Sequence, residues 1–525
     1  MSTVLLFAGL VAGVVVLTPL ADRWRIPLPV LLTLFGLLVP LLPGVRPIQI
    51  EPDLILPVVL PPLLFAATQR ATARDFRDNA RPIALLAVGL TLVTAGVVAT
   101  VGHAMGVPWG PALVLGAIVA PPDPVAATAV ARRLRLPGRL VTVLEGEGMF
   151  NDATALVLYK VSVAAVIAGG LSAIGLTRNI VLAVGVGVGL GLAAGVLTRA
   201  ALARLHLAAP ETTVTLAVPF VAYLVADRLG GSGVLAVLTL GLYLRTYGHG
   251  AITSGGWLLG RAVWRYADYI VTSMVFVFIG FELTAVLEAE PLESGSIVLA
   301  LAVCGVLVAV RFVWLFPAVW LAQLRRRRTT SQGSPVGNRE TLITAWAGMR
   351  GVVTVATALA LPAVTSAGAS FPLRRTVVFV GLVSVLATLV VQGLTLAPLV
   401  RRLGVGSDVD VAREARALRR RATAAALDAL RGHLTDGVPE RVREAVTLQY
   451  EGYLAAQDAV GAARSGAADN DLDDGDHRAV DNLLRQVSEV ERELVIQARR
   501  AGEVSAEAAD EVLDDVESRS VRDTG

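Results

Sequence analysis

Long apolar runs separated by short polar connections fill the first 402 residues of the chain. A helix needs about 20 apolar residues to cross a bilayer. Runs near that length predict thirteen membrane-spanning helices, at about 3–20, 27–43, 54–68, 82–103, 111–131, 139–168, 179–201, 212–228, 232–246, 266–287, 296–322, 340–361 and 376–400. The third and ninth runs are short, so a re-entrant segment or a merged helix stays open as an alternative there. The pattern predicts an all-α polytopic membrane protein.

The hydrophobic pattern changes near residue 403, where charged residues become frequent. From Leu403 to the end the chain carries 16 basic and 26 acidic residues, although the net charge of the whole chain is +3. Apolar residues such as Leu483, Val487 and Leu494 recur there at helical spacing. We therefore predict a transmembrane domain over 1–402 and a water-soluble helical tail over 403–525, for which regulation is a candidate role.

The composition agrees with this division. Hydrophobic residues make up 54% of the chain and charged residues 17%, whereas soluble domains average about 25% charged residues. The single cysteine, Cys304, excludes an intrachain disulfide. The first run lacks a basic leader and a small-residue cleavage site, so we interpret residues 3–20 as a retained membrane span.

Arginine residues indicate how the membrane domain is oriented, because basic residues concentrate in cytoplasmic loops. With the N-terminus outside, twenty arginines fall in cytoplasmic connections and five in outer ones. The cytoplasmic set is Arg23, Arg25, Arg70, Arg74, Arg77, Arg81, Arg132, Arg133, Arg135, Arg139, Arg199, Arg204, Arg245, Arg261, Arg265, Arg325, Arg326, Arg327, Arg328 and Arg339, and the outer set is Arg46, Arg178, Arg228, Arg374 and Arg375. We predict a plasma-membrane protein with its N-terminus outside and its tail in the cytoplasm.

The fifth run contains a cluster of prolines that breaks its helix. Pro121, Pro122 and Pro124 remove backbone donors and clash with the preceding turn. Asp123 followed by Pro124 fits the cap and first position of a second half-helix. Irregular backbone survives at membrane depth only where it is buried in protein or lines water, and its carbonyls can then face a cation. The alternative is that Asp123 only caps a kinked helix.

The sixth run carries four polar residues, Glu145, Glu147, Asn151 and Asp152, inside a span. Each ionised side chain at that depth costs at least about 2.5 kcal/mol, so such residues normally serve a function. Glu147 and Asn151 share one helix face, and Glu145 and Asp152 share another. A buried carboxyl that is protonated in one state and ion-bound in another is enough to exchange a proton for a cation.

The twelfth run places Arg350 between Gly348 and Gly351, which permits a second broken helix. Arginine stays charged, so within the membrane Arg350 needs a carboxylate partner. We predict Glu147 as that partner, with Glu145 as the second choice. Two further charges within runs, Glu282 and Arg311, are interpreted as structural.

Three motifs together resemble the sodium/proton exchanger family, the first family of monovalent cation:proton antiporters. They are E-G-E-G-M-F-N-D-A-T-A-L-V-L-Y in the sixth run, D-P-V-A in the fifth and G-M-R-G-V-V in the twelfth. The resemblance covers residues from about 5 to 402. It implies thirteen spans, inverted repeats with crossed broken helices, a homodimer, elevator-like alternating access, a role in pH homeostasis, and a bacterial transporter without enzyme activity or cofactor.

The resemblance also assigns roles by position. It implies a cation- and proton-binding set of Asp152, Asn151, Asp123 and the backbone carbonyl of Pro122, and a structural ion pair of Glu147 with Arg350. Asparagine at 151 resembles the electroneutral branch, in which one carboxylate exchanges one cation for one proton. Glu145, Glu282 and Arg311 are secondary candidates.

Three departures from the family pattern affect the identity of the cation. Pro122 stands where threonine is usual, Gly148 where serine is usual, and Ala66 where many members carry an acid in the third span. These changes remove hard oxygen ligands. We favour Na⁺, with Li⁺ or K⁺ as alternatives.

Other functions were weighed against cation/proton exchange. A K⁺/H⁺ antiporter of the same fold is the nearest alternative, followed by a cation channel or a transporter of organic solutes. Only 5% of the residues are aromatic, which argues against an organic solute. An intramembrane enzyme using Glu147 and Asp152 is disfavoured because these residues are five apart on one helix and point to different faces.

Overall fold

The computed structural model describes residues 3–24, 26–41, 52–70, 79–123, 128, 136, 138–168, 173–289, 294–326, 337–366, 368–405, 411–432, 438–458 and 474–524. Within these ranges the chain is helical, and its only β-type pairing is an isolated bridge between Val364 and Ser370. The elements are α1 (Thr3–Trp24), α2 (Leu28–Leu38), η1 (Val39–Leu41), α3 (Pro52–Arg70), α5 (Ala80–Ala84), η2 (Leu85–Leu90), α6 (Thr91–Ala104), α7 (Trp109–Val119), α9 (Gly138–Ile167), α10 (Ala173–Leu202), α11 (Ala208–Arg228), α12 (Gly233–Tyr247), η3 (His249–Ala251), α13 (Ser254–Ala289), α14 (Ser294–Arg326), α15 (Asn338–Trp346), α16 (Val352–Leu359), α17 (Arg374–Leu403), α18 (Val411–Arg431), α19 (Glu440–Asp458), α20 (Asp474–Ala501) and α21 (Ala506–Thr524).

The predicted all-α membrane fold is confirmed. Eight helices of the described chain are long and apolar enough to cross a membrane, and four shorter apolar helices accompany them. The two short runs of the sequence form separate helices, α3 and α12, so neither is merged with a neighbour. The total of thirteen spans stays a prediction.

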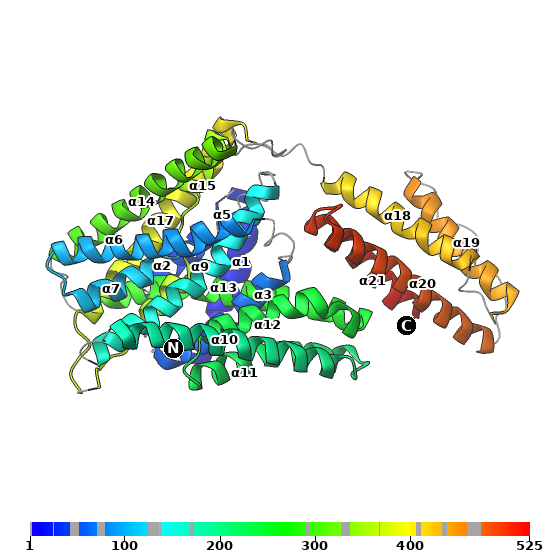
Figure 1. Cartoon of the computed structure of the whole chain (residues 1–525), viewed down its shortest axis with the longest axis horizontal. Coiled ribbons are helices and arrows are strands. Elements are labelled where there is room, and N and C mark those ends of the chain that lie inside the picture. The colour runs from blue at the N-terminus through cyan, green and yellow to red at the C-terminus, as the bar shows by residue number, and fades with distance from the viewer. Residues whose placement is uncertain are drawn as a thin grey trace. The chain divides into compact units, whose positions relative to one another are not determined.

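The described chain divides into two compact units. The first comprises Met1–Arg199, Leu216–Tyr247 and Trp264–Ser407. Its largest apolar cluster draws on α1, α2, α6, α7 and α13 to α17, and a second cluster joins α3 to α12. Helix α9 contributes to both clusters, with Leu144 and Tyr159 in the first and Met149 and Leu156 in the second. Figure 1 shows α9 running between α7 and α3. The central helix of the bundle is therefore the one that carries the polar motif.

Helices α2 and α13 cross at a very short distance because both present glycine. A Cβ added at Gly280 would lie 2.2 Å from the backbone nitrogen of Leu37 and 2.4 Å from the carbonyl oxygen of Thr33. A Cβ added at Gly36 would lie 2.0 Å from the carbonyl oxygen of Val277. Small residues at such contacts are the usual means by which membrane helices pack closely.

Replacing Gly280 with alanine should therefore destabilise the membrane unit. The new methyl group meets backbone atoms, which can move only if the two helices separate, and such overpacking costs about 1–3 kcal/mol. Thermal unfolding of the detergent-purified protein measures the effect. Gly305→Ala is the matched control, because nothing lies within 4 Å of a Cβ at that position of α14. Equal melting temperatures for the two variants would contradict the close crossing.

The second unit comprises Ala200–Thr215, Gly248–Val263 and Asp408–Gly525. The predicted helical tail is confirmed as α18 to α21, and α20 carries the predicted apolar stripe. Figure 1 shows α20 and α21 alongside each other. The tail helices do not form the unit alone, because Trp257 at the start of α13 packs against their apolar cluster. The sequence pattern did not predict this contact.

Charged contacts also join the tail to the connection between α12 and α13. Arg492 donates to the carbonyl oxygens of His249 and Ile252 at 2.6 Å and 2.9 Å. Arg261 pairs with Asp514 at 2.9 Å and donates to the backbone oxygen of Asp510 at 3.0 Å. The described part of the tail is thus tied to residues 248–263 by both apolar and charged contacts.

Candidate functional site

Two interruptions of helical structure meet in the membrane unit, as the prolines and glycines predicted. Helix α7 ends at Val119, and the chain is irregular at Pro121–Asp123. The other interruption separates α15 from α16 between Trp346 and Val352. The backbone N–H of Asp123 donates to the carbonyl oxygen of Met349 at 2.6 Å. This bond joins the two irregular segments at their crossing, and the predicted second half-helix at Pro124 lies outside the described residues.

Gly351 allows the Asp123 carboxylate to lie against the second interruption. A Cβ added at Gly351 would be 1.7 Å from Asp123 Oδ2, so no other residue fits there without displacing the carboxylate. Asp123 is 7% exposed and lies at the N-terminal end of α16, where the unpaired backbone N–H groups favour an anion. Asp123 therefore also stabilises the N-terminal end of α16.

Glu147 pairs with Arg311 rather than with the predicted partner Arg350. Arg311 Nη1 and Nη2 donate to Glu147 Oε1 and Oε2 at 2.5 Å and 2.8 Å, in a two-pronged pair whose side chains are 3% and 2% exposed. Arg311 Nε donates to the carbonyl oxygen of Thr344 at 3.0 Å. A Cβ at Gly348 would lie 2.6 Å from Arg311 Cδ, so this glycine leaves room for the side chain.

Arg350 satisfies backbone carbonyls instead of a carboxylate. Its Nε donates to the carbonyl oxygen of Val119 at 2.8 Å, and its Nη1 donates to the carbonyl oxygen of Gly348. Its backbone N–H donates to Thr388 Oγ1 at 2.9 Å. Val119 is the last residue of α7, whose terminal carbonyls lack intrahelical partners. The guanidinium therefore stabilises a half-helix end, which corrects the prediction of a Glu147–Arg350 pair.

Asn151 and Asp152 differ in their contacts although they are adjacent on α9. Asn151 Nδ2 donates to the carbonyl oxygen of Pro122 at 3.2 Å, which leaves Asn151 Oδ1 buried without a hydrogen-bond partner in the described chain. Asp152 is 9% exposed and makes no hydrogen bond or ion pair with any described residue. Burying a carboxylate without a partner is costly, so Asp152 is the group at this site best suited to take up a proton or a cation.

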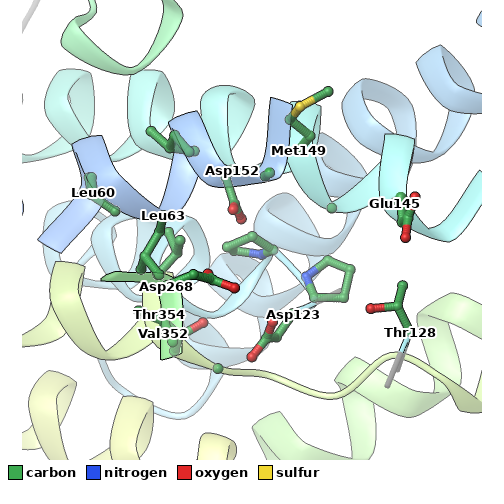
Figure 2. A pocket seen from close by; sticks show the side chains of 17 residues that line it. Leu60, Leu63, Asp123, Thr128, Glu145, Met149, Asp152, Asp268, Val352 and Thr354 are labelled. Atoms are coloured by element: carbon green, nitrogen blue, oxygen red, sulfur yellow. The ribbon is translucent and has the colours of Figure 1, made fainter. Parts of the chain in front are cut away.

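Asp152 faces a cavity of about 80 Å³, which has room for several water molecules. Figure 2 shows its carboxyl group pointing into this space from α9, with Asp123 and Thr354 on the opposite wall. The predicted residues Pro122, Gly148 and Glu145 also line the cavity. Helix α3 contributes only apolar side chains to the lining, namely Leu60, Leu63, Leu64 and Ala67. The cavity therefore brings together the broken helix, the polar helix α9 and the second interruption.

Three polar lining residues were not predicted from the sequence, namely Thr128, Asp268 and Thr354. Asp268 of α13 extends into the cavity, and Thr354 lies in the first turn of α16. Asp268 sits near the beginning of a predicted span, where an acidic residue is unremarkable. Thr354 follows the G-M-R-G-V-V motif directly, and this position next to the motif was the only sequence signal that could have indicated a role at the site. Ala66 packs in the apolar cluster of α3 and α12 and does not line the cavity.

The remaining secondary candidate, Glu282, lies on α13 outside the cavity lining. The described residues contain no group of three or more histidine, cysteine or acidic side chains that could hold a metal ion.

Comparison with known proteins identifies relatives of the membrane unit. A sequence profile described as sodium/hydrogen exchanger, transmembrane, matches residues 9–402. An uncharacterised sodium/proton exchanger of Mycobacterium tuberculosis is 38% identical over 432 residues, which cover 80% of this chain and 78% of that protein. The sodium/proton antiporter ApNhaP of Aphanothece halophytica is 30% identical over 406 residues, or 75% and 73% of the two chains.

A third relative and a solved structure extend the comparison. A Bacillus pumilus protein named as a sodium, potassium, lithium and rubidium/proton antiporter is 28% identical over 435 residues, covering 80% of this chain and 64% of that protein. The structure of the sodium/proton antiporter MjNhaP1 from Methanocaldococcus jannaschii matches with a TM-score of 0.59 and 18% identity, covering 77% of this chain and 99% of that chain. At this identity the structural match concerns the fold alone.

Proposed function

Because the chain belongs to the sodium/hydrogen exchanger family of multi-pass membrane antiporters, we propose that it exchanges a monovalent cation for a proton through Asp152. Antiporters are transporters and not enzymes, and they work without a cofactor. The single observation that carries the assignment is the environment of Asp152, which is buried, faces a cavity and has no hydrogen-bond or ion-pair partner among the described residues. A proton or a cation neutralises this carboxylate, and the two compete for it.

The neighbouring groups have supporting roles in this proposal. Pro122 and Asp123 line the cavity with Asp152 and would supply a neutral carbonyl oxygen and a second carboxylate, while Asn151, which is not among the lining residues, donates to that carbonyl through its Nδ2. Asn151 adds no charge next to Asp152, which favours an electroneutral exchange of one cation for one proton. The Glu147–Arg311 pair and Arg350 hold the polar segments in place without carrying the ion.

We propose Na⁺ as the favoured cation, with Li⁺ or K⁺ as alternatives. The name of ApNhaP supports sodium, whereas the name of the Bacillus pumilus relative includes potassium, lithium and rubidium. A cation channel and a transporter of organic solutes are less favoured, because the cavity is small and lies at a protonatable group. In the cell we expect a role in pH homeostasis at the plasma membrane, as a homodimer formed by the membrane domain. The transport domain would span 1–402, with the N-terminus outside and the tail of residues 403–525 in the cytoplasm.

Everted membrane vesicles provide the direct test of this function. With a pH gradient imposed across vesicles that contain the protein, added Na⁺ should collapse the gradient, with a rate that saturates as the cation concentration rises. We expect half-saturation at a lower concentration for Na⁺ than for K⁺. Vesicles without the protein are the control. If no monovalent cation collapses the gradient, antiport is the wrong function, and a rate that rises without saturation would indicate a channel.

A further inference from the structure

The hydroxyl group of Thr354 is a buried polar group that has no role in the exchange mechanism proposed above. The residue is 1% exposed, and Thr354 Oγ1 has no hydrogen-bond partner in the described part of the chain. Buried hydroxyl groups in native proteins are nearly always hydrogen-bonded, so each exception calls for an explanation. Thr354 lines the cavity that Asp152 faces, so its hydroxyl group lies beside the space that an ion would occupy.

The contrast with Thr357 shows that the orientation of Thr354 is unusual within its own helix. Both residues lie in α16 and are buried, but Thr357 Oγ1 donates to the carbonyl oxygens of Val353 and Thr354 at 2.7 Å and 3.1 Å. Such back-bonding to the preceding turn is the ordinary solution for a threonine in an apolar helix. Thr354 lies in the first turn of α16, three residues after Gly351, where the interruption ends, and does not use this solution.

The wall that carries Thr354 also carries a negative charge from another helix. Asp268 of α13 lines the same cavity, one helical turn beyond Trp264, whose ring packs on Phe65 of α3 at 4.5 Å. Figure 2 shows the carboxyl group of Asp268 pointing into the space between Asp152 and Thr354. Because α3 lines the cavity with apolar side chains only, the oxygen atoms on this side come from α13 and α16.

We propose that Thr354 Oγ1 is a direct ligand of the transported cation, on a wall where Asp268 supplies the accompanying negative charge. The inference rests on the proposed exchange and adds a residue to its binding site. Chemically, the hydroxyl offers a hard neutral oxygen that small monovalent cations prefer. It replaces the hydroxyl groups that are absent at Pro122 and Gly148, and Asp268 replaces the acid that is absent at Ala66.

Thr354→Val removes the hydroxyl while conserving the shape of the side chain. In reconstituted vesicles of the full chain, we expect the concentration of Na⁺ at half-maximal rate to rise about tenfold, as for loss of one bond to a charged group. The maximal rate should change little, because Asp152 still exchanges the proton. The preference for Na⁺ over K⁺ should fall, since the smaller ion depends more on close oxygen ligands. Thr354→Ser keeps the oxygen and should restore the wild-type value.

The matched control is Thr357→Val, which removes a buried hydroxyl from the same helix at a position that does not line the cavity. Its half-saturating Na⁺ concentration should equal that of the wild type. Asp268→Asn tests the second part of the proposal and should raise the same concentration, whereas Asp268→Glu should not. Asp22→Asn on α1 controls for the loss of one acidic residue.

The possible outcomes separate this inference from the proposed function. Wild-type protein that exchanges Na⁺ for protons, together with an unchanged half-saturating concentration in Thr354→Val, overturns the ligand assignment alone. A lower maximal rate with unchanged half-saturation also overturns it, because that result places Thr354 in the conformational step. Wild-type protein without exchange overturns the proposed function and this inference with it. If Thr354→Val does not accumulate, Thr354→Ala removes the same oxygen and decides the question.

Discussion

Asp152→Asn is expected to abolish exchange of cations for protons in everted vesicles. The asparagine side chain is similar in size but can neither release a proton nor balance the charge of a cation. Removing one member of a buried charge pair costs about 3–5 kcal/mol, which corresponds to a loss of affinity of at least about 100-fold. The rate at which Na⁺ collapses an imposed pH gradient measures the effect. Asp152→Glu keeps a carboxyl group and should retain part of the wild-type exchange rate.

The loss must come from chemistry and not from misfolding. Asp152 makes no hydrogen bond or ion pair with the described residues, so its replacement by asparagine leaves no buried charge behind and should keep or raise the melting temperature. A variant that melts at or above the wild-type temperature and still exchanges at the wild-type rate would refute the assignment of Asp152.

Glu147→Gln is expected to give the largest loss of stability among single substitutions in the membrane unit. It leaves the guanidinium of Arg311 charged and buried at 3% exposure, and breaking one partner of a buried pair costs about 3–5 kcal/mol. Arg311→Gln should cost a similar amount by leaving Glu147 unpaired. The double variant should be more stable than the sum of the two losses predicts, because it leaves no unpaired charge. Thermal unfolding of the purified variants gives these values.

A second double-mutant cycle, which combines Glu147→Gln with Arg350→Gln, tests the pairing of Glu147 with Arg311. Arg350 donates to carbonyl oxygens of Val119 and Gly348, so Glu147→Gln should couple less strongly to Arg350→Gln than to Arg311→Gln. Coupling between neighbouring residues in one network commonly reaches 0.5–3 kcal/mol, whereas independent sites add within about 0.5 kcal/mol. Stronger coupling for Glu147 with Arg350 than for Glu147 with Arg311 would show that the sequence-based pairing was right.

The sequence predicted the parts of this site that depend on local chemistry. Prolines at 121 and 122 and glycines at 348 and 351 weaken a helix, so the sequence could predict both breaks, although α3 stays helical through Pro57, Pro61 and Pro62. The placement of Asp152 and Asn151 followed from helical spacing within one span. The partner of Glu147 was not predictable, because Arg311 and Arg350 both lie in predicted spans. The choice depends on how α14 and the interruption between α15 and α16 are placed against α9. Arg350 belongs to the G-M-R-G-V-V motif, which favoured it over Arg311 in the prediction from sequence.

One physical reason explains why the sequence did not predict the roles of Thr354, Asp268 and Trp257. Thr354 and Asp268 gain their significance from a cavity bounded by α3, α9, α13 and the two interruptions, and no single stretch of sequence encodes that cavity. A threonine in an apolar helix normally bonds to its own backbone, as Thr357 does, and only the three-dimensional structure shows that Thr354 does not. The contact of Trp257 with the tail was missed for the same reason, because sequence periodicity predicts helices but not their docking.

The bond between Asp123 N and Met349 O has a consequence for how the protein is made. The acceptor is synthesised 226 residues after the donor, a delay of roughly 10 to 45 s at about 5–20 residues per second. Arg350, which closes the end of α7, arrives one residue later still. During translation the bend at Pro121–Asp123 therefore enters the membrane without the groups that will satisfy it. Backbone groups in lipid need partners, so the insertion machinery or trapped water must shelter this bend until the twelfth predicted span emerges from the ribosome.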